Sequence, residues 1–89
     1  MKLINIGYGN MINSQKVVSV VGPDAAPIKR LIQDTRDSGK LIDATSGKKT
    51  RSVIIADSGH IVLSALTSET IQNRLNSESD IESEAEDNE

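Results

Sequence analysis

Three basic side chains lie within four positions of this 89-residue chain, at Lys48, Lys49 and Arg51. Cations spaced so closely on a loop can contact adjacent phosphates without any charge being buried. Lys16 joins them in one patch only if the fold brings it next to this loop, and the alternative is a solvated loop without a ligand. Because Tyr8 is the only aromatic residue, the pattern favours contacts to a duplex backbone over stacking with single-stranded bases.

The formal charge is distributed unevenly along the chain. Residues 1–76 carry ten basic and six acidic side chains, a formal charge of +4, whereas residues 77–89 carry seven acidic and no basic ones, which brings the whole chain to -3. A basic body is what a protein that binds a polyanion requires. The last residues are too polar to offset the entropy of ordering them. We therefore expect a folded domain over residues 1–76 and a disordered acidic tail over residues 77–89.

Few residues are suited to catalysis or to binding a metal or cofactor. The chain has no cysteine and one histidine, His60, which follows a glycine turn, so neither a nucleophile with its base nor a set of metal ligands is indicated. The G-x-G of residues 7–10 lacks the third glycine of a dinucleotide site, and residues 46–50 lack the upstream glycine of a phosphate-binding loop. We expect no enzymatic activity, no cofactor and no metal, with a small-molecule sensor using residues 7–10 as a remaining alternative.

Runs of β-branched residues separated by turns predict an α+β domain with a mainly antiparallel sheet. Strands are expected at residues 3–6, 16–21, 40–43, 52–56 and 61–65. Residues 44–51 are interpreted as the loop of a hairpin between the third and fourth of these strands, and Asp57-Ser58-Gly59 as the turn before the fifth. The runs Ile54-Ile55 and Ile61-Val62-Leu63 are apolar without alternation, which predicts that both faces of these strands are covered.

One long and one short helix are expected. The long helix runs from an N-cap at Asp24, with Pro27 in its first turn, to about Ser38, and Gly39 is placed for a C-terminal cap. Its apolar face, which should pack on the sheet, consists of Ile28, Leu31, Ile32 and Thr35. The short helix begins after Thr67 or Ser68, and it presents Ile71 and Leu75 on one face. This helix or a neighbouring subunit is expected to cover the other face of the sheet.

The expected core is small for an independent domain. A body of about 76 residues buries only roughly 60% of its unfolded surface, and Phe and Trp are absent. Since there is no cysteine for a disulfide, self-association is the remaining common means of stabilisation. No apolar run is long enough to span a membrane, and no signal-peptide pattern is present. We therefore expect a homo-oligomer located in the cytoplasm, without a membrane partner or a small-molecule substrate.

Four segments carry a resemblance to a known family. They are Asn5-Ile6-Gly7-Tyr8-Gly9-Asn10, Asp24-Ala25-Ala26-Pro27-Ile28-Lys29-Arg30, Asp37-Ser38-Gly39-Lys40 and Asp43-Ala44-Thr45. In this order they resemble the RemA family, the regulator of extracellular matrix genes in Bacillus and its relatives. The resemblance covers roughly residues 3–75 and excludes the acidic tail.

The resemblance implies a double-stranded DNA-binding transcriptional activator of biofilm matrix genes, nucleoid-associated and without enzymatic activity. It further implies a fold similar to LytTR DNA-binding domains and a closed ring of about seven or eight subunits. The family has DNA-binding arginines where this chain has Lys16, Lys48, Lys49 and Arg51, and a functionally required proline at the position of Pro27. Lysine at three of these positions keeps the charge but not the bidentate geometry of arginine.

The leading interpretation is thus an oligomeric DNA-binding regulator. Its phosphate contacts are assigned to Lys16, Lys48, Lys49 and Arg51, with secondary contacts from Arg30 and Arg36. Pro27 is given a structural role in the helix that should support the subunit interface. The alternative from another class is a ring-shaped scaffold whose lysine-rich loop binds an acidic protein partner, because such loops attract acidic proteins as well as phosphate.

Overall fold

The computed structural model describes residues 2–77 as an α+β domain with one long and one short helix, which confirms the predicted fold class. In chain order the elements are β1 (Leu3–Asn5), β2 (Met11–Asn13), the 3-10 helix η1 (Ser14–Lys16), β3 (Val17–Val21), α1 (Ala26–Ser38), β4 (Leu41–Asp43), β5 (Ser52–Ala56), β6 (Ile61–Ser64) and α2 (Ser68–Asn76). Apart from Ser77, the predicted acidic tail lies outside the described residues. No helix among residues 2–77 is long and apolar enough to cross a membrane.

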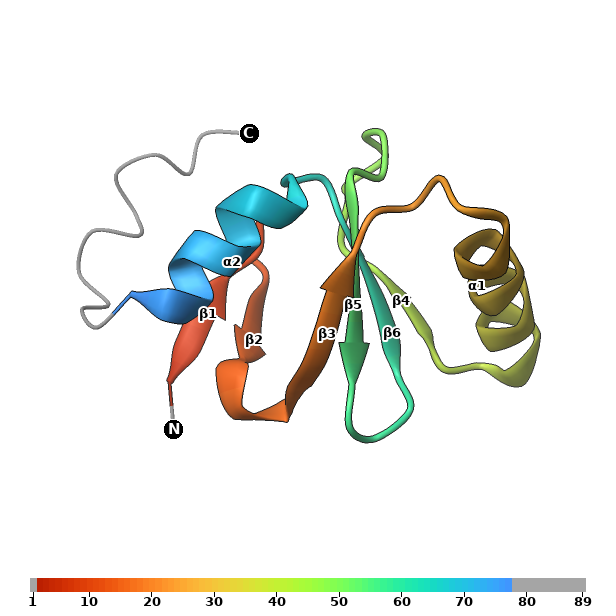
Figure 1. Ribbon diagram of the computed structural model, residues 1–89, viewed down its shortest axis with the longest axis horizontal. Coiled ribbons are helices and arrows are strands. Elements are labelled where there is room, and N and C mark those ends of the chain that lie inside the picture. The colour runs from red at the N-terminus through yellow and green to blue at the C-terminus, as the bar shows by residue number, and fades with distance from the viewer. Residues whose placement is uncertain (1, 78–89) are drawn as a thin grey trace.

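A four-stranded sheet with the order β3-β5-β6-β4 forms the centre of the domain (Figure 1). β3 and β5 are antiparallel, as are β5 and β6, whereas β4 runs parallel to β6. β1 and β2 form a separate antiparallel pair. The central strands β5 and β6 therefore have a neighbour on both edges, and β3 and β4 are the edge strands of this sheet.

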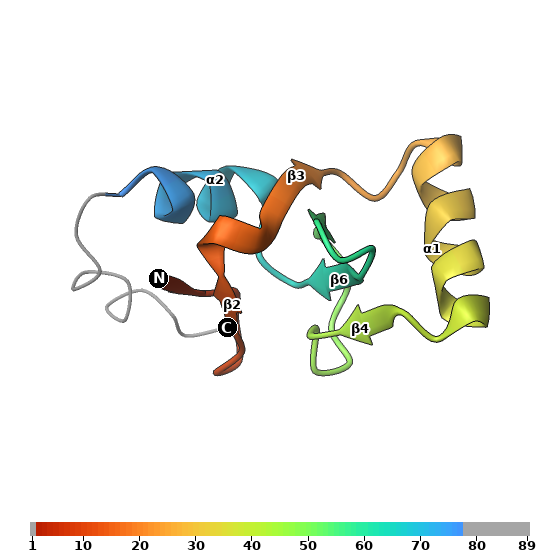
Figure 2. The ribbon, with the colours of Figure 1, turned by 90° about the horizontal axis from the view of Figure 1, so that it is seen from below.

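Both faces of the sheet are covered, as the uninterrupted apolar runs predict. Seen from below, α1 lies on one side of the sheet, and α2 lies with the β1–β2 pair on the other (Figure 2). Val53, Ile61 and Leu63 form the buried cluster on the α1 side. The second cluster faces α2 and the β1–β2 pair, and consists of Ile4, Ile6, Ala44, Ile54, Val62, Leu66 and Ile71. Each of the two helices thus helps to bury one face of the central sheet.

The predicted hairpin between residues 40–43 and 52–56 is wrong. The tight turn after β5 pairs β5 with β6, while β3 occupies the other edge of β5. Only the outer edge of β6 remains for β4, which pairs there in parallel, Leu41 opposite Ile61. Residues 44–51 are consequently a connection that crosses the end of β6, and not a hairpin loop.

Two other differences concern the N-terminal half. β2 was not predicted, because its three residues are too few to show a periodic pattern, yet Ile12 pairs with Ile4 of β1. Lys16 does not open a strand but ends η1, directly before β3. The N-terminal half therefore contains a hairpin on the α2 side that the sequence pattern did not indicate.

The helix ends agree largely with the sequence. Pro27 lies in the first turn of α1, and Gly39 caps its C-terminus in the left-handed conformation. Ala25 and not Asp24 is the N-cap, because the Ala25 carbonyl already accepts hydrogen bonds from the backbone of Ile28 and Lys29. Thr67 caps α2 through its side chain, as predicted.

Two buried serines face each other in the central sheet, and one of them links the sheet to the segment after β1. Ser52 of β5 and Ser64 of β6 lie opposite each other and are fully buried. The Ser64 hydroxyl donates to the Ile6 carbonyl at 2.8 Å and accepts from the Leu66 backbone at 3.0 Å. Within residues 2–77 the Ser52 hydroxyl has no hydrogen-bond partner. The two residues are thus equally buried but differ in hydrogen bonding.

We predict that Ser64→Ala lowers the free energy of unfolding by about 1–3 kcal/mol, because it leaves buried backbone groups without a partner. Ser52→Ala removes an unsatisfied hydroxyl and should leave the free energy unchanged or raise it by up to about 1 kcal/mol. Urea denaturation of both variants measures the difference. Equal destabilisation by the two substitutions would contradict this assignment.

Candidate nucleic-acid interface

The connection between β4 and β5 is fixed at both ends to the last residues of β6. The backbone N–H of Ala44 donates to the Leu63 carbonyl at 2.9 Å, and that of Arg51 donates to the Ser64 carbonyl at 2.8 Å. These bonds continue the ladders on the two edges of β6. The connection therefore projects from one end of the sheet, as Figure 1 shows above β5. We call this end the loop end, defined by Lys48, Lys49 and Arg51.

A turn inside the connection is held by a carboxylate at its base. Asp43 Oδ1 accepts hydrogen bonds from the Thr45 backbone at 2.9 Å and from the Thr45 hydroxyl at 2.6 Å. The Lys48 backbone donates to the Thr45 carbonyl at 3.0 Å, and the tip between them has positive φ at Ser46 and Gly47. Thr45 is buried. The turn thus has an ordered base from which Lys48 and Lys49 extend.

The β1–β2 turn supports the same connection from the side. The Asn10 side-chain amide donates to the Gly7 carbonyl at 2.9 Å and to the Ala44 carbonyl at 3.3 Å. Gly7, with a φ of +109°, would place an added Cβ within 3.4 Å of the Leu66 side chain. A glycine is therefore needed where this turn packs against the segment after β6. Residues 7–10 act here as a support for the connection.

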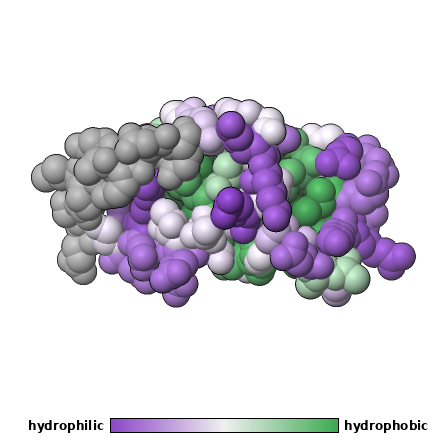
Figure 3. All heavy atoms as spheres, turned by 90° about the horizontal axis from the view of Figure 1, so that it is seen from above, coloured by the Kyte–Doolittle hydropathy of each residue, from purple (hydrophilic) through white to green (hydrophobic). Residues whose placement is uncertain are grey.

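All three cations of the loop end are exposed. Seen from above, the molecule shows strongly hydrophilic side chains over its middle, with hydrophobic side chains on either side (Figure 3). Exposed ammonium and guanidinium groups on an ordered turn can contact phosphate oxygens without a large desolvation cost. Lys48, Lys49 and Arg51 are therefore accessible to a ligand, and their role as phosphate contacts stays a prediction.

Lys16 lies at the opposite end of the sheet. Its carbonyl accepts a hydrogen bond from the backbone of Asp57, in the turn between β5 and β6, at 2.8 Å. Arg51 precedes the first residue of β5 and Asp57 follows the last, so at a rise of about 3.3 Å per residue the two ends are roughly 20 Å apart. Within one subunit Lys16 thus does not join the cations of the loop end.

The two arginines of α1 are both exposed, but only one is linked to the connection. Arg36 lies near enough to Asp43 for its charge to affect that carboxylate. The pKa of Asp43 is lowered from its ordinary value, first by the hydrogen bonds from the Thr45 side chain and backbone and then by Arg36, while burial opposes the shift. Arg30 lies six residues earlier in α1. Arg36 is therefore the better placed of the two predicted secondary contacts.

Sequence reasoning did not identify the residues that position the loop end. Asp43, Thr45 and Asn10 hold the connection through side-chain hydrogen bonds. The Asp-x-Thr pattern of residues 43–45 was an available signal, because an aspartate commonly accepts a hydrogen bond from the backbone two residues later. Lys40, which lies directly before β4, was also not predicted to be a functional residue.

No metal-binding arrangement is present in the part of the chain that the structure describes. No group of three histidine, cysteine, aspartate or glutamate residues lies close enough there to hold an ion. His60 belongs to the β5–β6 turn, where its Nδ1 lies 2.7 Å from the Ser58 hydroxyl. Both residues of this contact belong to the same turn.

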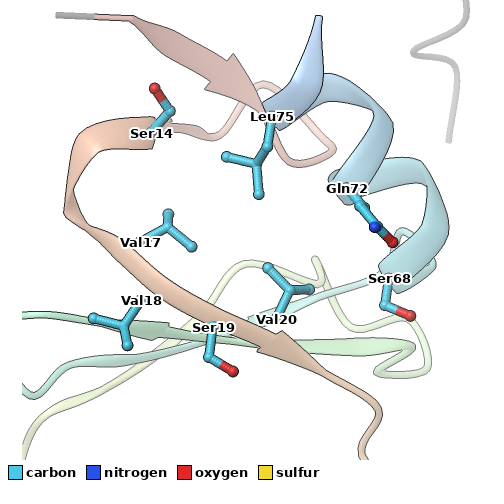
Figure 4. A pocket seen from close by; sticks show the side chains of 8 residues that line it. All are labelled: Ser14, Val17, Val18, Ser19, Val20, Ser68, Gln72 and Leu75. Atoms are coloured by element: carbon cyan, nitrogen blue, oxygen red, sulfur yellow. The ribbon is translucent and has the colours of Figure 1, made fainter.

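A groove of about 370 Å³ separates the edge strand β3 from α2. In Figure 4, Val17 and Val20 point from β3 towards Leu75 of α2, and Ser68 and Gln72 line the helix side. Val18 on the same strand is 66% exposed. The outer edge of β3 is thus an apolar surface with a groove beside it.

Comparison with known proteins assigns the chain to a family. The sequence model described as "RemA-like: Extracellular matrix regulatory protein A-like" matches residues 3–75. The chain belongs to the RemA-like family. This confirms the predicted resemblance, and the match covers every element from β1 into α2.

Relatives with a high sequence identity share the length of this RemA-like chain. A protein of Geobacillus kaustophilus is 56% identical over 84 residues, which are 94% of this chain and 97% of the relative. A protein of Halalkalibacterium halodurans is 55% identical over 85 residues, 96% and 98% of the two chains. A third from Moorella thermoacetica is 57% identical over 77 residues, 86% and 85% of the two chains. All three are provisionally named regulatory proteins, in agreement with the regulatory description of the family.

The lowered pKa of Asp43 predicts a specific loss of stability in acid. A carboxylate with a lowered pKa in the folded state stabilises the fold above its unfolded pKa of about 4, and this contribution disappears as the pH falls through the folded value. The urea midpoint of the unmodified protein should therefore fall more between about pH 5 and pH 3 than that of Asp43→Asn. Asp34→Asn, at an exposed position of α1, removes a carboxylate away from Thr45 and is the matched control. An identical pH dependence of Asp43→Asn and the unmodified protein would refute the prediction.

Proposed function

We propose that this RemA-like protein is an oligomeric transcription regulator that binds double-stranded DNA through the backbone and activates extracellular matrix genes. The family description supplies the regulatory role and the class of genes. The exposed cations of the loop end supply the chemistry of DNA binding. Phosphate contacts of this kind give affinity without base recognition. The proposal includes a location in the cytoplasm, on the nucleoid, and no catalytic activity.

The observation that carries the proposal is the ordered presentation of Lys48, Lys49 and Arg51. A solvated loop without a ligand needs no support, whereas this one is fixed to β6 on both sides and held by Asp43 at its base. Restricting the backbone beneath long basic side chains reduces the entropy lost when they bind. The arrangement is therefore suited to phosphates at defined positions.

Self-association into a closed ring is the second part of the proposal. β3 and β4 are the two edges of the central sheet, and each exposes an apolar side chain, Val18 at 66% and Ile42 at 48%. Different surfaces at opposite edges suit a head-to-tail contact, which closes into a ring if the rotation between subunits allows it. A ring of about seven or eight copies repeats one modest cationic patch and raises its avidity.

An acidic protein partner is the competing ligand for the same cations. Acidic side chains and phosphates are both attracted to exposed lysines, and salt weakens either interaction. Contacts to a duplex differ because log affinity falls linearly with log salt, by about 0.9 for each phosphate contact, whatever the sequence. The salt dependence of duplex binding is therefore the measurement that distinguishes DNA from an acidic protein as the ligand.

The first test removes the two lysines at the tip of the turn. Lys48→Ala with Lys49→Ala should reduce duplex affinity equally for unrelated sequences and lower the salt slope by about 0.9 per lost contact. Replacing both with arginine should preserve the slope and strengthen binding, because arginine donates to phosphate in a bidentate manner. Fluorescence anisotropy with a labelled duplex over a salt series measures both effects.

Lys29→Ala is the control for this test, because Lys29 is exposed on α1 outside the assigned contacts. Its affinity and slope should stay close to those of the unmodified protein. If the unmodified protein fails to bind any duplex at low salt, the DNA-binding proposal is wrong. Binding that is unaffected by the alanine pair would instead move the contacts away from the loop end.

The oligomer is tested at the edge of β3. Val18→Asp places a charge on the proposed contact surface and should lower the particle mass measured by light scattering, because burying an unpaired carboxylate is costly. Gln33→Asp, at an exposed polar position of α1, is the matched control and should leave the mass unchanged. An unaltered mass for Val18→Asp would exclude the edge of β3 from the interface.

A further inference from the structure

The end of the sheet opposite the loop end also brings two lysines together. The Asp57 backbone donates to the Lys16 carbonyl at 2.8 Å, and the Ile61 backbone donates to the Lys40 carbonyl at 3.0 Å. These bonds place Lys16 beside the end of β5 and Lys40 beside the start of β6, with the turn of residues 57–60 between them. We call this the turn end, and Figure 1 shows its turn at the bottom of the sheet.

Lys16 is directed towards this turn by a weak ion pair. Its Nζ lies 3.9 Å from Asp57 Oδ2, and the two side chains are 62% and 50% exposed. Exposed ion pairs contribute little to stability, at most about 1 kcal/mol. The ammonium group of Lys16 can therefore exchange this carboxylate for another anion at a small cost.

Lys40 approaches the turn from the other side. Its Nζ donates to the Ser58 carbonyl at 3.3 Å, and an added Cβ at Gly59 would lie 3.6 Å from the same nitrogen. The ammonium group of this exposed lysine thus lies beside a glycine with a φ of +91°. An ammonium has three donors, so this contact leaves capacity for a phosphate oxygen.

We infer that the turn end is a second phosphate-binding site of each subunit, formed by Lys16 and Lys40, and that Asp57 limits its affinity. The inference rests on the proposed DNA binding and adds Lys40 as a contact and Asp57 as an opposing charge. Lys16 and Lys40 directly precede β3 and β4, which are three strand spacings apart in the sheet, roughly 14 Å. Lys16 Nζ nevertheless contacts Asp57 and Lys40 Nζ contacts Ser58, so the two ammonium groups lie at adjacent residues of the same turn.

The separation of the two ends determines how a duplex would use them. The roughly 20 Å between the loop end and the turn end corresponds to about six base pairs along the axis of a duplex, at a rise of about 3.4 Å for each phosphate of one strand. The two sites therefore bind different phosphates and contribute independently to affinity. This arrangement gives Lys16 a role in DNA binding without requiring it to lie next to Lys48.

Asp57 has two effects on a bound phosphate, and both oppose it. Its carboxylate pairs with Lys16, and it adds a negative charge beside the anion. Asp57→Asn should therefore tighten duplex binding, whereas a substitution that merely disturbs the fold would weaken it. The direction of the change in duplex affinity therefore distinguishes a binding role of Asp57 from a structural one.

The test compares Lys40→Ala, Lys16→Ala and Asp57→Asn with two controls, Lys29→Ala and Asp34→Asn. Each lysine substitution should lower the salt slope by about 0.9 per lost contact. When the salt is raised from about 50 to about 200 mM, the affinity of each such variant should therefore fall by a factor about three- to fourfold smaller than that of the unmodified protein. Asp57→Asn should tighten binding more than Asp34→Asn, which makes the same change of charge away from the turn. Light scattering confirms that the particle mass is unchanged.

Three results would overturn the inference. They are a Lys40→Ala variant that behaves like Lys29→Ala, an Asp57→Asn variant that binds no more tightly than Asp34→Asn, and a changed particle mass, which would place the turn end in a subunit contact. If one of these occurs while the loss of Lys48 and Lys49 still weakens binding, the proposed function stands without the second site. If no variant and no condition gives duplex binding, both proposals fail.

Discussion

The position of β6 between β4 and β5 is the constraint on which the presentation of the cations depends. Because β4 and β5 lie on opposite edges of β6, the eight residues that join them must cross the end of that strand. The backbone bonds from Ala44 and Arg51 to β6 fix where the crossing begins and ends. A hairpin between β4 and β5 would have projected freely beyond both strands. The crossing instead starts and ends at β6, so Lys48 and Lys49 project from the end of the central strands.

The same central strands also determine the opposite end of the sheet. β5 and β6 are covered on both faces by the two hydrophobic clusters, and each is paired along both edges. They are the part of the domain with the least freedom to move. Because Lys16 and Lys40 are hydrogen-bonded through their backbones to residues at the turn end of these strands, the two ends are held at a nearly constant separation. The proposed phosphate contacts at both ends would therefore favour a duplex whose phosphates match that spacing.

The sequence predicted the elements that local patterns define and failed where distant segments choose their partners. The 3.6-residue period and Gly39 were enough to predict α1, and Asp57-Ser58-Gly59 was enough to predict the turn between β5 and β6. Nothing in Leu41–Asp43 indicates which strand edge it will join, so the crossing connection could not be predicted. The cations of the loop end were found from their spacing alone. The contact between Lys40 and the turn could not be predicted, because it depends on the pairing of β4 with β6, which is a tertiary property.

Local grouping of charge matters more for this chain than its net charge. The whole sequence carries a formal charge of -3, which by itself would repel a polyanion. At physiological ionic strength, however, charges are screened beyond about 8 Å, so a phosphate at the loop end responds mainly to Lys48, Lys49 and Arg51. Lysine at two of these positions gives each subunit only a modest hold on phosphate. In the proposed DNA-binding oligomer the affinity would therefore come from repeating the patch over many subunits, so the edges of the sheet would matter as much to DNA binding as the cations themselves.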